Sequence, residues 1–231
     1  MCRMFAYVGN SERELNGLYM KLRDAAAHDE MAERLNVGFT QHGDGWGYAI
    51  AEEGGALHHY RTSLPIYKDV NRIPALKGSF SAIFHVRKAS DGSTIRPMFS
   101  HPFAEEDENS HTFFAHNGTL DKDALADELG FKGTTTDSEM AAKLFARDGE
   151  RCMKTLEKNT KSALNLLIMK IDRRNGRTSI FYKNYYARRG RDEFYDLHFQ
   201  KLRHGRTVYS STFNLLGMNG KKVRYGTLSR L

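Results

Sequence analysis

The chain opens with MCRMFAYVGN, residues 1–10, in which alternate residues from Met4 to Val8 are apolar and predict a short strand. Removal of Met1 would leave Cys2 with both a thiol and a free α-amine. A nucleophile and its base would then share one residue, whereas an internal thiol must find a base elsewhere in the fold. The competing interpretation is that Cys2 is a small buried residue that opens the strand. Position alone does not decide between the two.

The composition is that of a globular domain. The 231 residues are 40% hydrophobic, and we expect a single domain over residues 1–231. The two cysteines, Cys2 and Cys152, imply no disulfide framework and favour a reducing compartment. The start of the chain is too short and too polar for a signal peptide, and no run approaches the roughly 18 apolar residues of a membrane span. We therefore expect a cytoplasmic protein without membrane contact.

Charge is distributed unevenly along the chain. Residues 1–146 carry 15 Lys/Arg and 21 Asp/Glu, whereas residues 147–231 carry 20 and 7. The basic part interleaves cations with aromatic rings, a mixture that can bind phosphates and stack bases. Strands with one face toward a core give the same interleaving, so a solvated face is favoured over a nucleic-acid site, and an acidic protein partner fits better. The cations are Arg173, Arg174, Arg177, Lys183, Arg188, Arg189, Arg191, Lys201, Arg203 and Arg206.

Local signals predict an α+β chain of mostly antiparallel sheets packed against a few helices. Ser11 and Glu14 form a capping box that starts a helix through Ala26. Asp137 is expected to cap a long helix that runs to about residue 159. Asn175-Gly176 predicts a type I′ hairpin. Strands are expected at 46–52, 56–63, 80–88, 111–116, 163–172, 178–183, 195–201, 207–211 and 222–228, with a short helix at 121–129.

Two segments place a polar side chain where a buried strand ends or a loop follows. Arg87, in HVRKAS at 85–90, could grip a carboxylate with its fork of donors, or could be a solvated surface arginine. His101, in HPF at 101–103, is by itself more typical of a structural hydrogen-bonding histidine than of a catalyst.

Two further segments carry candidate donors and acceptors. Asn117 and Gly118 follow a buried strand, and a side-chain NH₂ with a backbone N–H could converge as an oxyanion hole. A plain β-turn is the interpretation that Asn-Gly favours without further context. Asp137 could hold a substrate ammonium if it faces a pocket, but capping is the default interpretation.

Read in order, six short motifs resemble the class II glutamine amidotransferase domain, an N-terminal nucleophile hydrolase, and in particular its small stand-alone members. The motifs are MCR at 1–3, HGDGWG at 42–47, HVRKAS at 85–90, HPF at 101–103, HNG at 116–118 and TDSE at 136–139. The resemblance covers roughly residues 2 to 145. It implies a four-layer αββα sandwich of mostly antiparallel sheets and glutamine as the amide substrate.

The resemblance also implies roles for individual residues. Cys2 matches the nucleophile, with its own α-amine as base, and Asn117 and Gly118 match the oxyanion hole. Attack on a γ-glutamyl amide would give a thioester, which water hydrolyses to glutamate after ammonia has left. No metal and no cofactor is implied.

Four other residues match the substrate-binding positions of that family. Arg87 matches the arginine that grips the glutamine α-carboxylate, with Ser90 as a helper. Asp137 matches the residue that holds the α-ammonium, and His101 matches a pocket histidine. Asp91 departs from the amino-sugar-forming relatives, which have a histidine at this position.

Three functions remain open from the sequence. The chain could be a glutaminase that delivers ammonia to a separate synthase subunit, which the basic C-terminal half could dock. It could be a free-standing hydrolase of another γ-glutamyl amide. It could also be a non-catalytic binding module that uses the basic half.

Overall fold

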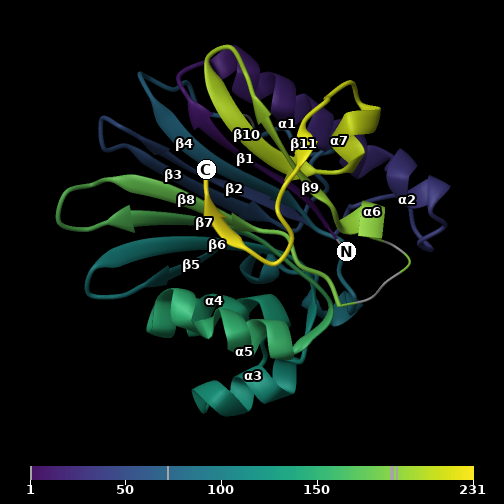
Figure 1. The fold of residues 1–231 in the computed structure, drawn as a ribbon, viewed down its shortest axis with the longest axis vertical. Helices are drawn as coiled ribbons and strands as arrows, with labels where there is room; N and C mark the ends of the chain where they lie inside the picture. The colour runs from purple at the N-terminus through teal and green to yellow at the C-terminus, as the bar shows by residue number, and fades with distance from the viewer. Residues whose placement is uncertain (1, 72, 188–189, 191) are drawn as a thin grey trace.

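The computed structural model describes residues 2–71, 73–187, 190 and 192–231. Two β-sheets pack face to face, and helices cover the outer surface of each sheet (Figure 1). All strand pairs within the two sheets are antiparallel. The α+β class and the αββα layering predicted from the sequence are confirmed.

The first sheet has seven strands in the order β11-β9-β10-β1-β4-β2-β3. Strand β1 lies inside this sheet and pairs with β4 on one side and with β10, from the far end of the chain, on the other. The strands are β1 (Arg3–Gly9), β2 (Trp46–Glu52), β3 (Leu57–Thr62), β4 (Phe80–Val86), β9 (Leu197–Lys201), β10 (Gly205–Ser210) and β11 (Lys221–Lys222).

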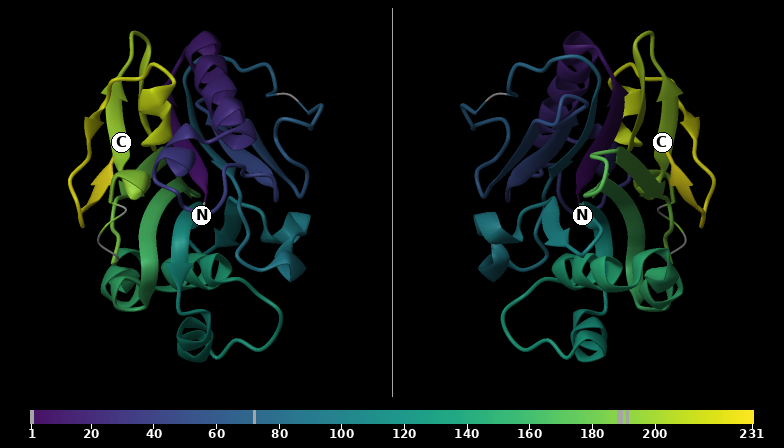
Figure 2. Two further views of the ribbon diagram at one scale, coloured as in Figure 1. Left: turned by 90° about the vertical axis from the view of Figure 1, so that its right-hand side faces the viewer. Right: turned by 90° about the vertical axis from the view of Figure 1, so that its left-hand side faces the viewer.

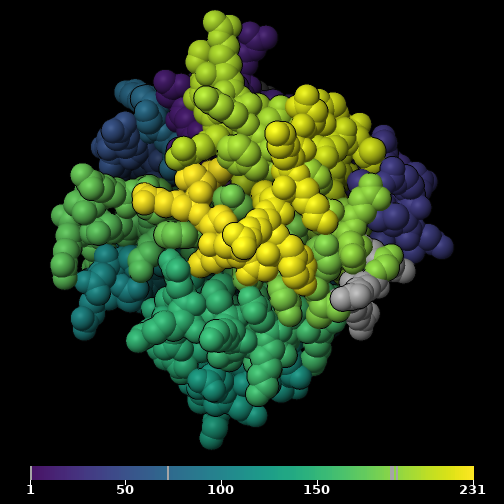
Figure 3. Space-filling view, viewed as in Figure 1, coloured from purple at the N-terminus to yellow at the C-terminus, as the bar shows by residue number. Residues whose placement is uncertain are grey.

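The second sheet has five strands in the order β12-β8-β7-β6-β5. The last segments of the chain reach both sheets, since β11 joins the first and β12 the second, and they spread over the face shown in Figure 3. The strands are β5 (Phe103–Glu106), β6 (Ser110–Leu120), β7 (Thr160–Asp172), β8 (Thr178–Lys183) and β12 (Leu228–Arg230).

The helices divide between the two outer faces. The outer face of the first sheet is covered by α1 (Glu12–Ala27), with α2 (Glu30–Arg34) and α7 (Thr212–Leu215) beside this helix. The outer face of the second sheet is covered by α3 (Lys122–Leu129), α4 (Asp137–Asp148) and α5 (Met153–Lys158). Short turns complete the set: α6 (Asp192–Tyr195) and the 3₁₀ helices Gly92–Thr94, Pro97–Phe99 and Gly149–Cys152. Across the described residues, every helix is too short or too polar to cross a membrane.

Alternation along the strands builds the layers. In β1, Phe5 belongs to the cluster beneath α1, whereas Met4 belongs to the cluster between the sheets. In β6, Phe114 packs toward α4, whereas Phe113 faces the first sheet. Successive side chains of a strand point to opposite faces, so each strand contributes to two cores at once.

The start of α1 follows its sequence signal. The Ser11 hydroxyl accepts a hydrogen bond from the Glu14 N–H at 3.2 Å, as an N-cap does. The Glu14 carboxylate does not complete the capping box. It accepts instead from the Tyr7 hydroxyl at 2.9 Å and the His204 N–H at 2.9 Å, which ties the helix to the end of the first sheet.

The predicted long helix from Asp137 is wrong in two respects. Thr136 is the N-cap, because its hydroxyl accepts from the Glu139 N–H at 3.2 Å, and Asp137 is the first helical residue. The helix ends at Asp148, where Gly149 takes a left-handed φ of 61°, so it does not run on to residue 159 as one element.

Three other local predictions fail. In the turn between β7 and β8 only Gly176 has a positive φ (69°), whereas a type I′ turn needs two such residues. The strand expected at 222–228 is two short strands in different sheets, β11 and β12. The expected end of a strand at Asn117-Gly118 is also wrong, since β6 continues to Leu120.

Three cations of the basic half, Arg188, Arg189 and Arg191, lie outside the described residues.

Packing of α1 predicts a contrast between two of its residues. The side chain of Leu22 is fully buried in the core that α1 covers, whereas that of Met20 is 46% exposed. We expect Leu22→Ala to lower the free energy of unfolding by about 2–5 kcal/mol, because a buried cavity replaces the side chain. Met20→Ala, the matched control on the same helix, is expected to change it by no more than about 0.5 kcal/mol. Urea unfolding followed by circular dichroism measures both, and equal effects would contradict this packing.

Candidate active site

A cavity of about 220 Å³ opens where β1 and α4 begin and where β4 and β6 end. It is close to the N-terminus, which lies at the junction of the two sheets (Figure 2). It brings together six of the seven residues proposed from the sequence. The lining residues are Cys2, Arg87, Lys88, Ser90, Asp91, Thr94, His101, His116, Gly118, Thr119, Leu120, Lys122, Thr135, Thr136, Asp137 and Ser138.

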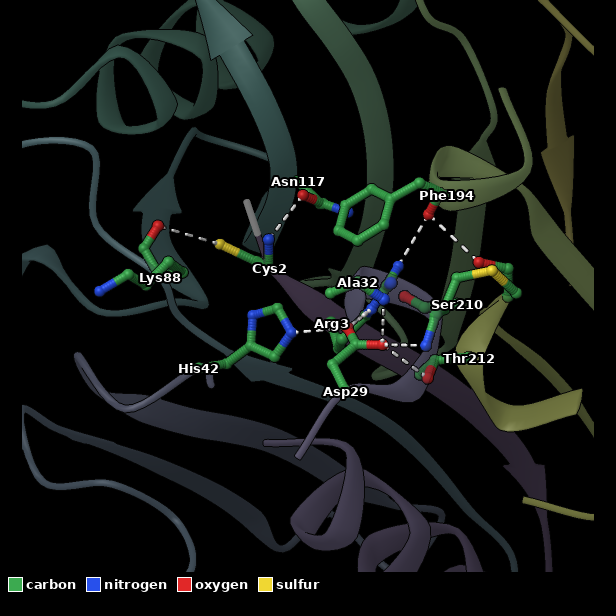
Figure 4. Close-up of polar contacts among 12 residues, drawn as sticks. Cys2, Arg3, Asp29, Ala32, His42, Lys88, Asn117, Phe194, Ser210 and Thr212 are labelled. Carbon is green, nitrogen blue, oxygen red and sulfur yellow. Dashed lines mark hydrogen bonds and ion pairs between the residues drawn. The ribbon is translucent and has the colours of Figure 1, made fainter. Parts of the chain in front are cut away.

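Cys2 directly precedes the first residue of β1 and is 6% exposed. Its backbone N–H donates to Asn117 Oδ1 at 2.8 Å, and its sulfur contacts the Lys88 carbonyl oxygen at 3.9 Å (Figure 4). The nitrogen and the sulfur of one residue are therefore held from two sides, by β6 and by the segment after β4.

Asn117 is the one proposed site residue that does not line the cavity, and it is buried behind Cys2. Figure 4 shows its carboxamide with the oxygen toward Cys2 and the nitrogen on the side away from the thiol. The structure therefore shows Asn117 as an acceptor for the Cys2 nitrogen. The two oxyanion donors expected from the sequence do not converge in this arrangement.

Gly118 lines the cavity and has a φ of 154°, in the region that favours glycine. A Cβ at this position would lie 1.8 Å from the Ala163 carbonyl oxygen on β7. Only glycine lets β6 approach β7 this closely while it faces the cavity, which explains the residue type independently of any chemistry.

Arg87 is buried at the end of β4, and its guanidinium is held by one residue of the following loop. Nη1 donates to the Thr94 carbonyl at 2.7 Å and Nη2 to the Thr94 hydroxyl at 2.6 Å. Ser90, in the same loop, is exposed at the rim of the cavity. The fork of Arg87 is thus fixed in direction before any ligand arrives. Thr94 carries no sequence signal that would have identified it.

Asp137 faces the cavity from the first turn of α4. One carboxylate oxygen accepts from the Leu120 N–H at 2.8 Å, and the other from the N–H of Ser138 at 2.9 Å. Each oxygen keeps a second lone pair. The carboxylate lies across the same cavity that Arg87 lines, so one cationic and one anionic group are available to a bound ligand.

Three histidines form the buried back of the site. His116 contacts the Ser138 hydroxyl through Nδ1 (2.9 Å) and the Ala163 carbonyl through Nε2 (3.1 Å). The rings of His85 and His101 lie 4.0 Å apart, and neither ring nitrogen of His101 has a hydrogen-bond partner among the described residues. Burial lowers the pKa of all three, which favours their neutral forms.

Sequence reasoning missed a second group beside Cys2. Arg3, Asp29 and His42 are fully buried, and both Arg3 and His42 bond to the Asp29 carboxylate. They come from three separate segments, so no spacing in the sequence connects them. In the described part of the chain, no three His, Cys, Asp or Glu side chains are grouped as metal ligands.

Comparisons with known proteins bear on the family and the fold. The family model described as "Glutamine amidotransferases class-II" matches residues 31–178. No curated protein matches the chain. A solved structure of the allosteric regulatory enzyme of purine biosynthesis superposes with a TM-score of 0.64 at 20% identity, covering 99% of this chain and 46% of that one.

A second solved structure, glutamine phosphoribosylpyrophosphate amidotransferase from B. subtilis complexed with ADP and GMP, gives a TM-score of 0.64 at 19% identity. It covers 100% of this chain and 49% of that one. The chain thus spans about half the length of these two solved structures, and the likeness to them shows the fold. Because the family model covers more than half of the sequence, the chain belongs to the class II glutamine amidotransferases.

Proposed function

We propose that the chain hydrolyses the side-chain amide of glutamine through a γ-glutamyl thioester on Cys2, once Met1 has been removed. The observation that carries the proposal is the placement of Cys2. Its nitrogen is fixed by Asn117 at 2.8 Å while the residue lines the cavity, so a free amine at this atom would stand beside its own thiol.

The proposed reaction uses that amine as the base. The thiol proton passes to the amine, and the sulfur attacks the amide carbonyl carbon to give a tetrahedral oxyanion. The amine returns the proton to the leaving nitrogen, the C–N bond breaks, and ammonia departs. Water then attacks the thioester, which releases glutamate and regenerates the thiol.

The oxyanion needs donors that face the cavity. Gly118 lines the cavity without a side chain, and its backbone N–H is the first proposed donor. For Asn117 to donate as well, its carboxamide has to rotate so that the NH₂ replaces Oδ1 beside Cys2. That rotation would turn an N–H of the carboxamide toward the oxyanion.

The cavity walls fit the charges of an α-amino acid. Arg87, pre-oriented by Thr94, would bind the α-carboxylate, with Ser90 at the rim. Asp137 would bind the α-ammonium, and His101 would face the amide end with its two unpartnered ring nitrogens. Ammonia would then pass to an acceptor outside residues 1–231, which we propose to be a separate synthase.

One assay separates this proposal from hydrolysis of another γ-glutamyl amide. Ammonia release from glutamine is compared with amine release from γ-glutamyl amides, each with and without cell lysate. Faster turnover of glutamine, increased by lysate, supports the ammonia-delivering role. Strong activity on a different γ-glutamyl amide, unchanged by lysate, supports the free-standing hydrolase.

Cys2→Ala is expected to abolish glutamate formation, because no other thiol faces the cavity among the described residues. Cys152→Ala is the matched control. Burial raises the pKa of the Cys152 thiol to about 12, so this thiol is inert and its loss should leave turnover intact. Intact mass after treatment with a γ-diazoketone analogue of glutamine should show one adduct and no Met1 in the wild type. An adduct on Cys152 alone would overturn the assignment.

Asn117→Ala is expected to lower kcat by about 10² to 10³, the scale for loss of one oxyanion donor, with loss of the acceptor for the amine besides. Asn165→Ala is the control, since Asn165 is also buried and lies directly opposite Asn117 on β7, but outside the cavity lining. It should lower thermal stability and leave kcat within a few-fold. Near-normal kcat in Asn117→Ala would remove this residue from the mechanism.

Arg87→Lys is expected to raise the KM for glutamine by about tenfold or more, with kcat little changed, because a point charge replaces two charge-assisted hydrogen bonds. Arg96→Lys, an exposed arginine on the same loop, should leave KM unchanged. Initial-rate kinetics over a range of glutamine concentrations gives both constants. An unaltered KM in Arg87→Lys would show that the α-carboxylate binds elsewhere.

A further inference from the structure

The carboxylate of Asp29 collects hydrogen bonds from four separate segments of the chain. Arg3 Nε donates at 2.5 Å, His42 Nε2 at 2.8 Å and the Thr212 hydroxyl at 2.8 Å, and two backbone N–H groups in the first turn of α2 donate at 3.1 Å each. An ionised carboxylate only accepts, so Nε2 of His42 carries the ring proton. The group is drawn in Figure 4 beside Cys2.

This carboxylate is ionised although it is buried. Burial alone raises the pKa of Asp29, but the charge of Arg3 and the hydrogen bonds from His42 and Arg3 outweigh it and hold the pKa well below its ordinary value. Arg3 is fully buried as well. It stacks over the Phe194 ring at 3.8 Å and donates through Nη1 to the Phe194 carbonyl at 2.7 Å.

Stability alone does not account for this pair. Replacing a buried ion pair by apolar residues of similar volume is often neutral or stabilising, because desolvation offsets the attraction between the charges. Here Arg3 Nη2 is also buried without a hydrogen-bond partner in the described residues, which adds a further penalty. A role in positioning a neighbouring residue would explain why the Arg3–Asp29 ion pair lies here.

The neighbour is Cys2. The backbone ladder of β1 with β10 begins at Phe5, and the ladder with β4 begins at Arg3, so Cys2 lies beyond the last paired residue. The side chain of Arg3 is consequently the last one in β1 that fixes the backbone next to Cys2. A shift of this side chain moves the Cys2 nitrogen relative to Asn117 and the thiol relative to the cavity.

His42 connects Asp29 to the loop at residues 42–45, which contacts the end of β4. In this loop the Asp44 N–H donates to the Arg87 carbonyl at 3.0 Å, and the Arg87 N–H donates to the Gly45 carbonyl at 2.8 Å. One carboxylate therefore fixes both β1, which directly follows Cys2, and the loop that contacts Arg87.

We propose that Asp29 is a positioning residue for the Cys2 nucleophile. By fixing Arg3 it determines the position of the Cys2 amine and thiol at the start of β1. By fixing His42 it determines the position of the loop that contacts Arg87. The inference rests on the proposed function, because only a reacting thiol needs placement of this precision.

Asp29→Asn keeps the shape of the side chain and removes the charge beside Arg3. We expect kcat for glutamine hydrolysis to fall by about 10²-fold with KM within a few-fold, since misplacement of about 1 Å affects the transition state more than binding. The rate of Cys2 labelling by the γ-diazoketone analogue, followed by intact mass, should fall in parallel at saturating analogue.

Asp69→Asn is the matched control. Its carboxylate also accepts from several groups, the Trp46 indole N–H at 2.9 Å, the Tyr60 hydroxyl at 2.7 Å and the Asn71 N–H at 2.9 Å, but it does not line the cavity. It should lower the melting temperature and leave kcat and the labelling rate unchanged.

A double variant separates placement from stability. In Arg3→Met/Asp29→Asn no buried charge is left uncompensated, so the melting temperature should recover toward the wild type. A positioning role predicts that kcat stays low in this variant. Recovery of kcat together with the melting temperature, or a change confined to KM in Asp29→Asn, would overturn the inference.

The same experiment distinguishes the two proposals. If the wild type with Met1 removed neither hydrolyses glutamine nor takes the label, the proposed function fails, and this inference fails with it. If the wild type is labelled and Asp29→Asn is labelled equally fast, only the positioning role is refuted.

Discussion

Arg3 and Asp29 form an ion pair without solvent exposure at the point where β1 enters the first sheet. A guanidinium keeps its charge in proteins, so a buried arginine requires a compensating carboxylate nearby. The Asp29 carboxylate in turn accepts hydrogen bonds from α2, from His42 and from the Thr212 hydroxyl. The compensating carboxylate therefore joins several elements around the N-terminus at one point.

The second constraint is the close approach of the two sheets. Alanines from both sheets, Ala6, Ala49, Ala51 and Ala115, belong to the cluster between them. Small side chains let the sheets pack closely enough for the Cys2 nitrogen on the first sheet to reach Asn117 on the second. The cavity forms at this meeting point, where the ends of three strands and the start of α4 supply its walls.

Signals that act within a few residues predicted much of this fold. Strand alternation located β1, and apolar, aromatic runs located β4 and β6. Ser11 marked the start of α1 because a cap is a local hydrogen bond. The ordered motifs supplied six residues that line the cavity, and Asn117, which does not line it. Thr136 and Asp137 are adjacent residues that can both cap a helix, so sequence could not separate them.

What the sequence could not supply depends on distant partners. The direction of the Asn117 carboxamide is set by a residue 115 positions earlier, and the Asp29 hydrogen bond to Thr212 joins residues 183 positions apart. The split of residues 222–228 into β11 and β12 likewise depends on which sheet edge each half meets. The catalytic roles of the cavity residues remain predictions that the proposed variants test.

The pairing of β1 with β10 also orders events during synthesis. Phe5 pairs with Tyr209, so β10 has to be synthesised before β1 can be enclosed on its second side. A nascent chain that stops before residue 205 carries Cys2 but lacks the strand that encloses it. The site can therefore assemble only after synthesis has passed β10.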